Sequence, residues 1–213
     1  MIPKEILQAH YKEYASQSDA WVRNMAVTKR SIMRYVLAST ELQSPIQSAI
    51  LPVRIAVLGA SDKRYIPIHE RIFSDLLHRN VQVTTFDIDL EHLAGSPGAM
   101  EHDVTRPFPN PPYKIVFSHE LMKFLTPEEQ LQAMKNSYGA LAYTGLAMHI
   151  MHAPSIKGTS ELRAWQYRVN PDVLLEQLQR DGIPSKKVVF ESESEVSWLR
   201  ETTVIVIQKF CLA

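Results

Sequence analysis

The chain has 213 residues with 23 basic and 23 acidic side chains, so its formal net charge is zero when histidine is neutral. A chain without net charge has no overall field to attract nucleic acid or an anionic membrane, which disfavours both as partners. Its single cysteine, Cys211, excludes an intramolecular disulfide framework. No apolar run reaches the roughly 18 residues of a membrane span, and the amino terminus is too polar for a secretory signal. We therefore expect a cytoplasmic protein with one core domain and an appendage.

The amino-terminal segment contains no glycine and no strand pattern, and it is predicted to be helical. One helix is expected over residues 2–16 and a second from Asp19, which is the predicted N-cap. These helices either cover a flank of a sheet or close as a lid over a ligand. Because prolines bracket the stretch that follows, a boundary is predicted between an amino-terminal helical cap, residues 1–52, and a main domain, residues 53–213.

Residues 53–87 have the pattern of a strand–helix–strand unit. VRIAVLGAS is a near-continuous apolar run that breaks at Gly59, as expected of a parallel strand that is buried on both faces and ends in a tight turn. A helix is predicted over 66–80 and a second strand over 81–87, which is the right length for a βαβ unit. Asp87 would then stand at the carboxyl edge of the sheet, where a carboxylate accepts hydrogen bonds from both hydroxyls of a ribose.

The rest of the chain continues the alternation of strands and helices. Several prolines between residues 107 and 112 require the third strand to be short and to stop near Val104, with Asp103 at its end. A capping box at Thr126 and a cap at Asn170 predict two further helices, the second of which is closed by Gly182. Residues 186–191 and 202–210 read as two strands that pair antiparallel.

Two strand ends resemble the class I S-adenosylmethionine (SAM)-dependent methyltransferases. The FDID run at Asp87 resembles the ribose-binding segment of that family, and Asp103 in EHDVTRPFP matches the acid that faces the adenine amino group. YKIVFSHEL and TGLAMHIM, which follow in the chain, resemble the fourth and fifth strands. The resemblance implies a Rossmann-like α/β fold, a seven-stranded mixed sheet flanked by helices, in which strand 202–208 is inserted antiparallel near the edge.

The family's glycine motif is the weaker match. Its acid and GxGxG sequence correspond to Val57, Gly59, Ser61 and Lys63, so one glycine is retained. The resemblance nevertheless implies SAM as the cofactor. The residues expected to bind it are Gly59, Ala60, Ser61, Asp87, Ile88, Asp103, Val104 and Ser118.

The polar run after the fourth strand supplies the candidates for acid–base chemistry. His119 could accept a proton from an acceptor, and Glu120 could orient it, although solvated polar residues at the start of a loop would look the same. His149 and His152 invite a metal site, but side chains three residues apart in a strand point to opposite faces. We therefore predict no bound metal.

The sequence favours a methyltransferase that acts on a small-molecule acceptor, since the amide-flipping NPPY-type motif of nucleic-acid enzymes is replaced by SHEL. Two alternatives stay open. Ser61 and Lys63 suit a catalytically degenerate partner protein of the same fold, because a backbone approaches a ligand most easily at glycine. IAVLGASDKR also resembles the first turn of nucleotide- or CoA-binding domains, against which Asp87 argues. The identity of the acceptor is left undecided, as is homodimer formation.

Overall fold

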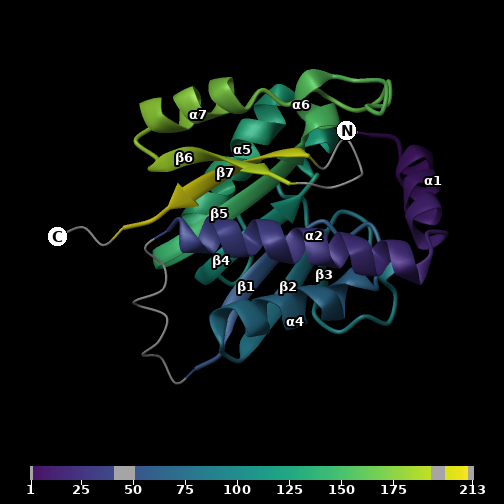
Figure 1. Ribbon diagram of the computed structural model, residues 1–213, viewed down its shortest axis with the longest axis horizontal. Helices are drawn as coiled ribbons and strands as arrows, with labels where there is room; N and C mark the ends of the chain where they lie inside the picture. The colour runs from purple at the N-terminus through teal and green to yellow at the C-terminus, as the bar shows by residue number, and fades with distance from the viewer. Residues whose placement is uncertain (1, 41–50, 193–199, 211–213) are drawn as a thin grey trace. The chain divides into compact units, whose positions relative to one another are not determined.

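The computed structural model describes residues 2–40, 51–192 and 200–210 (Figure 1). Its strands form one seven-stranded sheet in the order β3-β2-β1-β4-β5-β7-β6. The chain divides into two compact units, Met1–Asp103 (unit 1) and Val104–Ala213 (unit 2). The predicted mixed sheet is confirmed. The boundary at residue 52 stays a prediction, and residues 41–50, which precede it, lie outside the described residues.

Unit 1 is built on a parallel run of strands. Its elements are α1 (Lys4–Ala15), α2 (Asp19–Ala38), β1 (Val53–Leu58), α4 (Tyr65–Leu77), β2 (Val81–Asp87), the 3-10 helix η1 (Glu91–Leu93) and β3 (Ala99–Glu101). β1 pairs parallel with β2, and β2 pairs parallel with β3. The β1–α4–β2 connection is therefore the βαβ unit that the sequence predicts. Figure 1 shows that α1 and α2 run in different directions.

Two details of unit 1 correct the sequence prediction. Ser18, and not Asp19, is the N-cap of α2, because its hydroxyl accepts a hydrogen bond from the main-chain N–H of Trp21. Asp19 is instead the first helical residue, where a carboxylate suits the positive end of the helix dipole. β3 ends at Glu101, earlier than expected, so Asp103 lies beyond the strand.

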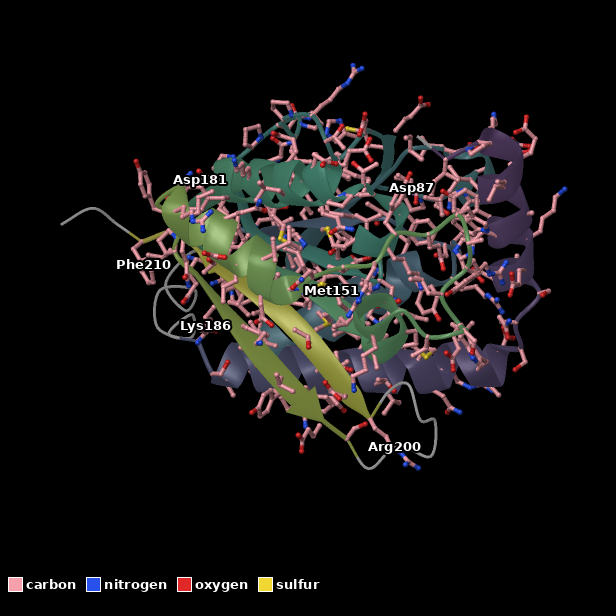
Figure 2. All side chains as sticks on the ribbon, turned by 90° about the horizontal axis from the view of Figure 1, so that it is seen from above. Asp87, Met151, Asp181, Lys186, Arg200 and Phe210 are labelled. Atoms are coloured by element: carbon pink, nitrogen blue, oxygen red, sulfur yellow. The ribbon has the colours of Figure 1, made fainter. Side chains whose placement is uncertain are left out.

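Unit 2 contains the fourth to seventh strands. Its elements are β4 (Tyr113–His119), the 3-10 helix η2 (Met122–Phe124), α5 (Pro127–Ala140), β5 (Leu141–His152), α6 (Ala153–Lys157), α7 (Pro171–Arg180), β6 (Ser185–Glu191) and β7 (Glu201–Gln208). β4 pairs parallel with β5, whereas β7 pairs antiparallel with both β5 and β6. The predicted insertion of β7 is confirmed. In Figure 2, Lys186 and Phe210 mark one end of the β6–β7 pair and Arg200 the other.

Local sequence explains where the helices of unit 2 begin. The Thr126 hydroxyl accepts from the Glu129 N–H while the Glu129 carboxylate accepts from the Thr126 N–H, so the predicted capping box is confirmed. The Asn170 side chain caps α7 in the predicted way. Within the described segments, no helix combines the length and the apolar character needed to cross a bilayer.

Candidate functional site

Asp87, the last residue of β2, is the centre of the polar cluster in unit 1 (labelled in Figure 2). Its side chain is 6% exposed. One carboxylate oxygen, Oδ2, accepts from the main-chain N–H of Ala60 at 2.9 Å, and the other, Oδ1, accepts from the Tyr11 hydroxyl at 3.0 Å. Burial raises the pKa of the Asp87 carboxyl, while the Ala60 N–H, the neighbouring His92 and the Tyr11 hydroxyl act in the opposite direction. Two segments far apart in sequence thus meet on one carboxylate.

The turn after β1 brings Ala60 to this carboxylate. Gly59 adopts a left-handed φ of 75°, which glycine takes without a steric cost. Its N–H donates to the carbonyl of Phe86 at 2.7 Å, so the turn is fastened to the end of β2. Of the predicted cofactor-binding residues, the structure therefore brings together Gly59, Ala60 and Asp87, with Ser61 half-buried in the same turn.

The same turn contains an ion pair that the sequence analysis missed. Asp62 is 5% exposed, and its carboxylate accepts from the Arg64 side chain at Nε, 2.8 Å away. The other guanidinium nitrogens of Arg64 donate to the carbonyls of Tyr14 and Gln17, at 3.2 and 2.9 Å, and pair with Asp19 at 2.7 Å. The signal in the sequence was an acid and an arginine two residues apart within the turn. Arg64 thereby holds the carboxyl end of α1.

The middle of α1, at Gln8 and Tyr11, lies against the loop after β2. The Tyr11 ring stacks on the His92 ring, with centroids 3.6 Å apart and planes inclined by 10°. Gln8 donates to Glu91 at 2.9 Å. Burial, followed by the charge of Asp87, raises the pKa of the Tyr11 hydroxyl, which therefore stays protonated and acts as a donor. These contacts make α1 a cover on the cluster.

Three further residues predicted to bind the cofactor differ in exposure. Ile88, which directly follows Asp87, is 40% exposed although it is aliphatic. Asp103 is half-buried and closes unit 1, whereas Val104 opens unit 2 and is buried. The carbonyl of Val104 accepts a hydrogen bond from the Asn136 side chain at 3.1 Å. Roles for Ile88, Asp103 and Val104 in cofactor binding stay predictions.

In unit 2, Ser118 lies inside the sheet. It is fully buried, and its hydroxyl is 2.9 Å from Nδ1 of His149 on the neighbouring strand. Burial lowers the pKa of His149 to about 3, so that this imidazole is neutral at physiological pH. The Ser118 hydroxyl therefore contacts β5 inside the sheet. Its role in cofactor binding stays a prediction.

His119 leads into a chain of hydrogen bonds across three strands. Its Nε2 lies 2.9 Å from Nε2 of His152, whose Nδ1 lies 2.9 Å from the hydroxyl of Thr202. His152 and Thr202 are fully buried, whereas His119 is partly exposed. Since one proton occupies the space between the two Nε2 atoms, the pair carries at most one positive charge while this contact lasts. His149 and His152 contact different partners, as their spacing predicted.

Glu120 connects the ends of β4 and β5. Its carboxylate accepts from the main-chain N–H of His152 at 2.6 Å, the Lys123 ammonium at 2.7 Å and the Ser155 hydroxyl at 2.6 Å. Burial alone would raise the pKa of Glu120, but the Lys123 and His152 charges and these donors outweigh it and lower the pKa. The residue is held at a φ of 58°, a conformation that costs a non-glycine residue energy. Its catalytic role stays a prediction.

The described residues contain no group of three or more histidine, cysteine, aspartate or glutamate side chains arranged to hold a metal ion. In unit 1 the polar cluster is centred on the buried Asp87 carboxylate. In unit 2 it consists of the His119–His152 pair and the hydrogen-bonded carboxylate of Glu120.

No protein-family model and no curated protein matches this chain. Solved structures do resemble it. The N-methyltransferase NodS of Bradyrhizobium japonicum WM9, in complex with S-adenosyl-L-homocysteine (SAH), has 11% identity and a TM-score of 0.58 over 96% of this chain and 97% of its own. The DhpI–SAH complex has 14% identity and a TM-score of 0.59 over 98% and 95%. A pericyclic reaction enzyme has 13% identity and a TM-score of 0.58 over 80% of this chain and 47% of its own. At such identities the likeness is one of fold.

Proposed function

Since the chain has the fold of the class I SAM-dependent methyltransferases, we propose that it binds SAM and transfers the methyl group to a small-molecule acceptor. The observation that carries the proposal is the Asp87 carboxylate, placed at the carboxyl end of β2 and held by the Ala60 N–H of the turn after β1. In α/β sheets a carboxylate at this position binds the hydroxyls of a ribose. The SAH complexes of NodS and DhpI, which share the fold, support this reading.

The residues around Asp87 suit an adenosine group. Ile88 offers an exposed apolar side chain on which a base can lie, and Asp103 is an acid accessible enough to accept from the adenine amino group. Gly59 allows the tight turn beneath the ligand. Lys63, which replaces a motif glycine, is exposed, so its side chain does not fill the interior of the unit.

SAM supplies a methyl group that is already activated by its sulfonium centre. The residues of the chain then have to position the acceptor and take up its proton, without a protein nucleophile. His119 is our candidate for the proton acceptor. In the tautomer in which His119 donates from Nε2 to His152, and His152 donates from Nδ1 to Thr202, the basic lone pair of His119 is on Nδ1. His152 would then stabilise the imidazolium that forms.

The test is calorimetric titration with SAH of the wild-type protein and of Asp87→Asn, which keeps the side-chain volume and a carbonyl acceptor for Ala60. Hydrogen bonds to a charged group contribute roughly 1.5 to 3 kcal/mol, so Asp87→Asn is expected to bind SAH roughly ten- to a hundredfold more weakly. Asp75→Asn, which removes an exposed carboxylate of α4, is the matched control and keeps wild-type affinity. Absence of SAH binding by the wild-type protein would refute the assignment, and equal affinity of Asp87→Asn would refute the role of Asp87.

The alternative is a catalytically inactive partner protein of the same fold, favoured by Ser61 and Lys63 in place of glycines. Both readings allow SAH to bind. They differ in turnover, because only the enzyme converts SAM to SAH when an extract of small molecules is supplied as acceptor. The resemblance to a pericyclic reaction enzyme is a reason to identify the methylated product by mass, since the fold alone does not fix the chemistry.

A further inference from the structure

The carboxylate that we assign to ribose binding already has a hydroxyl donor from the chain itself. The Tyr11 hydroxyl donates to Oδ1 of Asp87 at 3.0 Å, and both side chains are buried. A phenol and a ribose hydroxyl present the same kind of donor to a carboxylate. We propose that Tyr11 takes the place of a ribose hydroxyl on Asp87, and that α1 is a latch which must release this carboxylate before the ligand binds. The ligand named here rests on the proposed function.

The Tyr11 side chain contacts the loop after β2, which is itself linked to the turn after β1. Its ring is stacked on His92, which belongs to the loop after β2. His92 in turn has its Nε2 2.6 Å from the carbonyl of Ala60, in the turn after β1. The closed helix therefore joins the two segments that the ribose would have to contact. A ligand that takes both hydroxyl positions on Asp87 competes directly with Tyr11.

The first turns of α1 and its carboxyl end are held by different kinds of contact. In its first two turns, the Gln8–Glu91 hydrogen bond and the approach of Lys4 to the Asp89 carboxylate, 3.8 Å away, each involve an exposed side chain, whereas His10, next to Tyr11, is buried. Exposed pairs of this kind contribute little to stability, because water competes for both partners. At the carboxyl end, by contrast, Arg64 donates to main-chain carbonyls and is itself fixed by the buried Asp62.

The different contacts along α1 indicate how the helix would open. Because Arg64 holds the carboxyl end, α1 can swing away at its amino end while it stays attached near residues 16–18, which connect it to α2. Opening has to break the hydroxyl bond of Tyr11 and its stacking on His92. Closed molecules do not offer Asp87 to a ligand, so the measured dissociation constant equals the intrinsic constant divided by the open fraction.

The first experiment uses Tyr11→Phe, which keeps the ring on His92 and removes only the hydroxyl. Loss of this bond enlarges the open fraction, and we expect SAH to bind about five- to tenfold more tightly. Tyr35→Phe, which makes the same change on the exposed face of α2, is the matched control and keeps wild-type affinity. Weaker binding by Tyr11→Phe would show that Tyr11 belongs to the bound state, and it would overturn the latch.

The second experiment locks the helix. Gln8→Cys and Glu91→Cys, whose parent side chains are in contact, are joined by a short thiol-reactive cross-linker in a Cys211→Ser background. The cross-linked protein is expected to lose at least tenfold in SAH affinity, and the same protein without the cross-linker keeps it. Undiminished binding by the cross-linked protein would overturn the proposal.

A third measurement separates this proposal from the proposed function. If no form of the protein binds SAH, the proposed function fails, and the latch is then judged without ligand by hydrogen exchange. The amides of α1 are expected to exchange several-fold faster in Tyr11→Phe than in Tyr35→Phe, because a detached helix of 12 residues is marginally stable in water and unfolds. Equal exchange in the two variants would refute the latch.

Discussion

Lys29 is a buried ammonium group in α2. Its Nζ lies 3.3 Å from Nε2 of His69 and 3.8 Å from the centroid of the Tyr65 ring. Burial lowers the pKa of Lys29 to about 7. The pKa of His69 is lowered as well, first by burial and then by the lysine charge. The Lys29–His69 pair therefore carries little or no charge at the pH at which unit 1 is most stable.

This burial predicts how stability depends on pH. The pKa of a lysine in an unfolded chain is about 10.4, so between that value and the folded-state pKa of about 7 the unfolded state binds more protons. The free energy of unfolding therefore rises with pH through this window, and below it the full cost of burying the charge is present. We expect Lys29→Met to be more stable at pH 7, by on the order of 2 kcal/mol, and to lose most of this slope.

Denaturant unfolding of the two proteins at pH 7, 8 and 9 measures the effect of Lys29→Met. The matched control is Lys12→Met, which removes an exposed lysine of α1 and is expected to leave the slope unchanged. If the free energy of unfolding of Lys29→Met and of the wild-type protein changed with pH in parallel, the lowered pKa of Lys29 would be contradicted.

The contact between His119 and His152 predicts that their protonation is coupled. Because Nε2 of His119 and Nε2 of His152 are 2.9 Å apart, the two rings should take up only one proton between them while this contact lasts. Nuclear magnetic resonance of the imidazole nitrogens measures this, with His149, whose pKa is lowered to about 3, as the ring that stays neutral. Two complete and independent protonations would show that the pair does not act together, and would weaken the case for His119 as a base.

At the scale of elements, α1 and α2 have different roles although both precede the first strand. The buried residues of α2 include Ile32, Met33 and Val36, none of which is measurably exposed. Burying a side chain of this kind contributes about 1.5 to 3 kcal/mol, so these three together match a large part of the 5 to 15 kcal/mol that stabilises a typical domain. α2 therefore belongs to the core of unit 1, whereas α1, Lys4–Ala15, buries His10 and Tyr11 alone among its residues.

Two truncations test this difference. Removal of residues 1–17 deletes α1 and is expected to leave a folded protein whose melting temperature falls by only a few degrees. Removal of residues 1–40 also deletes α2 and is expected to abolish cooperative unfolding. Circular dichroism during heating distinguishes the outcomes. A folded, cooperative protein without residues 1–40 would show that α2 only covers the unit.

The sequence predicts best those element boundaries that are set by neighbouring residues in the chain. The capping box at Thr126 and the cap at Asn170 lie within a few residues of the helices that they start, and both were predicted. Asp19 was mistaken for a cap because Ser18, an equally good cap, stands beside it. The end of β3 was placed too late, since the prolines bound the strand but do not say where its pairing with β2 stops.

At the scale of the whole molecule, the sheet followed from the alternation of strands and helices, and the position of β7 from its pairing with β6. The candidate site was less accessible to sequence reasoning. Asp87 was found because it ends a strand, but its partner Tyr11 is 76 positions away. His152 meets Thr202 only because the β5–β7 register places them opposite each other. Such pairings depend on the three-dimensional arrangement and leave no pattern in the sequence.

The ion pair of Asp62 and Arg64 also bears on the conformational entropy of the chain. A turn built on several glycines is mobile in the unfolded protein and loses much of that freedom when it becomes ordered around a ligand. Here a single glycine, Gly59, is followed by bulkier residues, and the pair fixes their backbone before any ligand arrives. The ordering of this turn therefore accompanies folding, and a ligand meets a turn whose shape is already set.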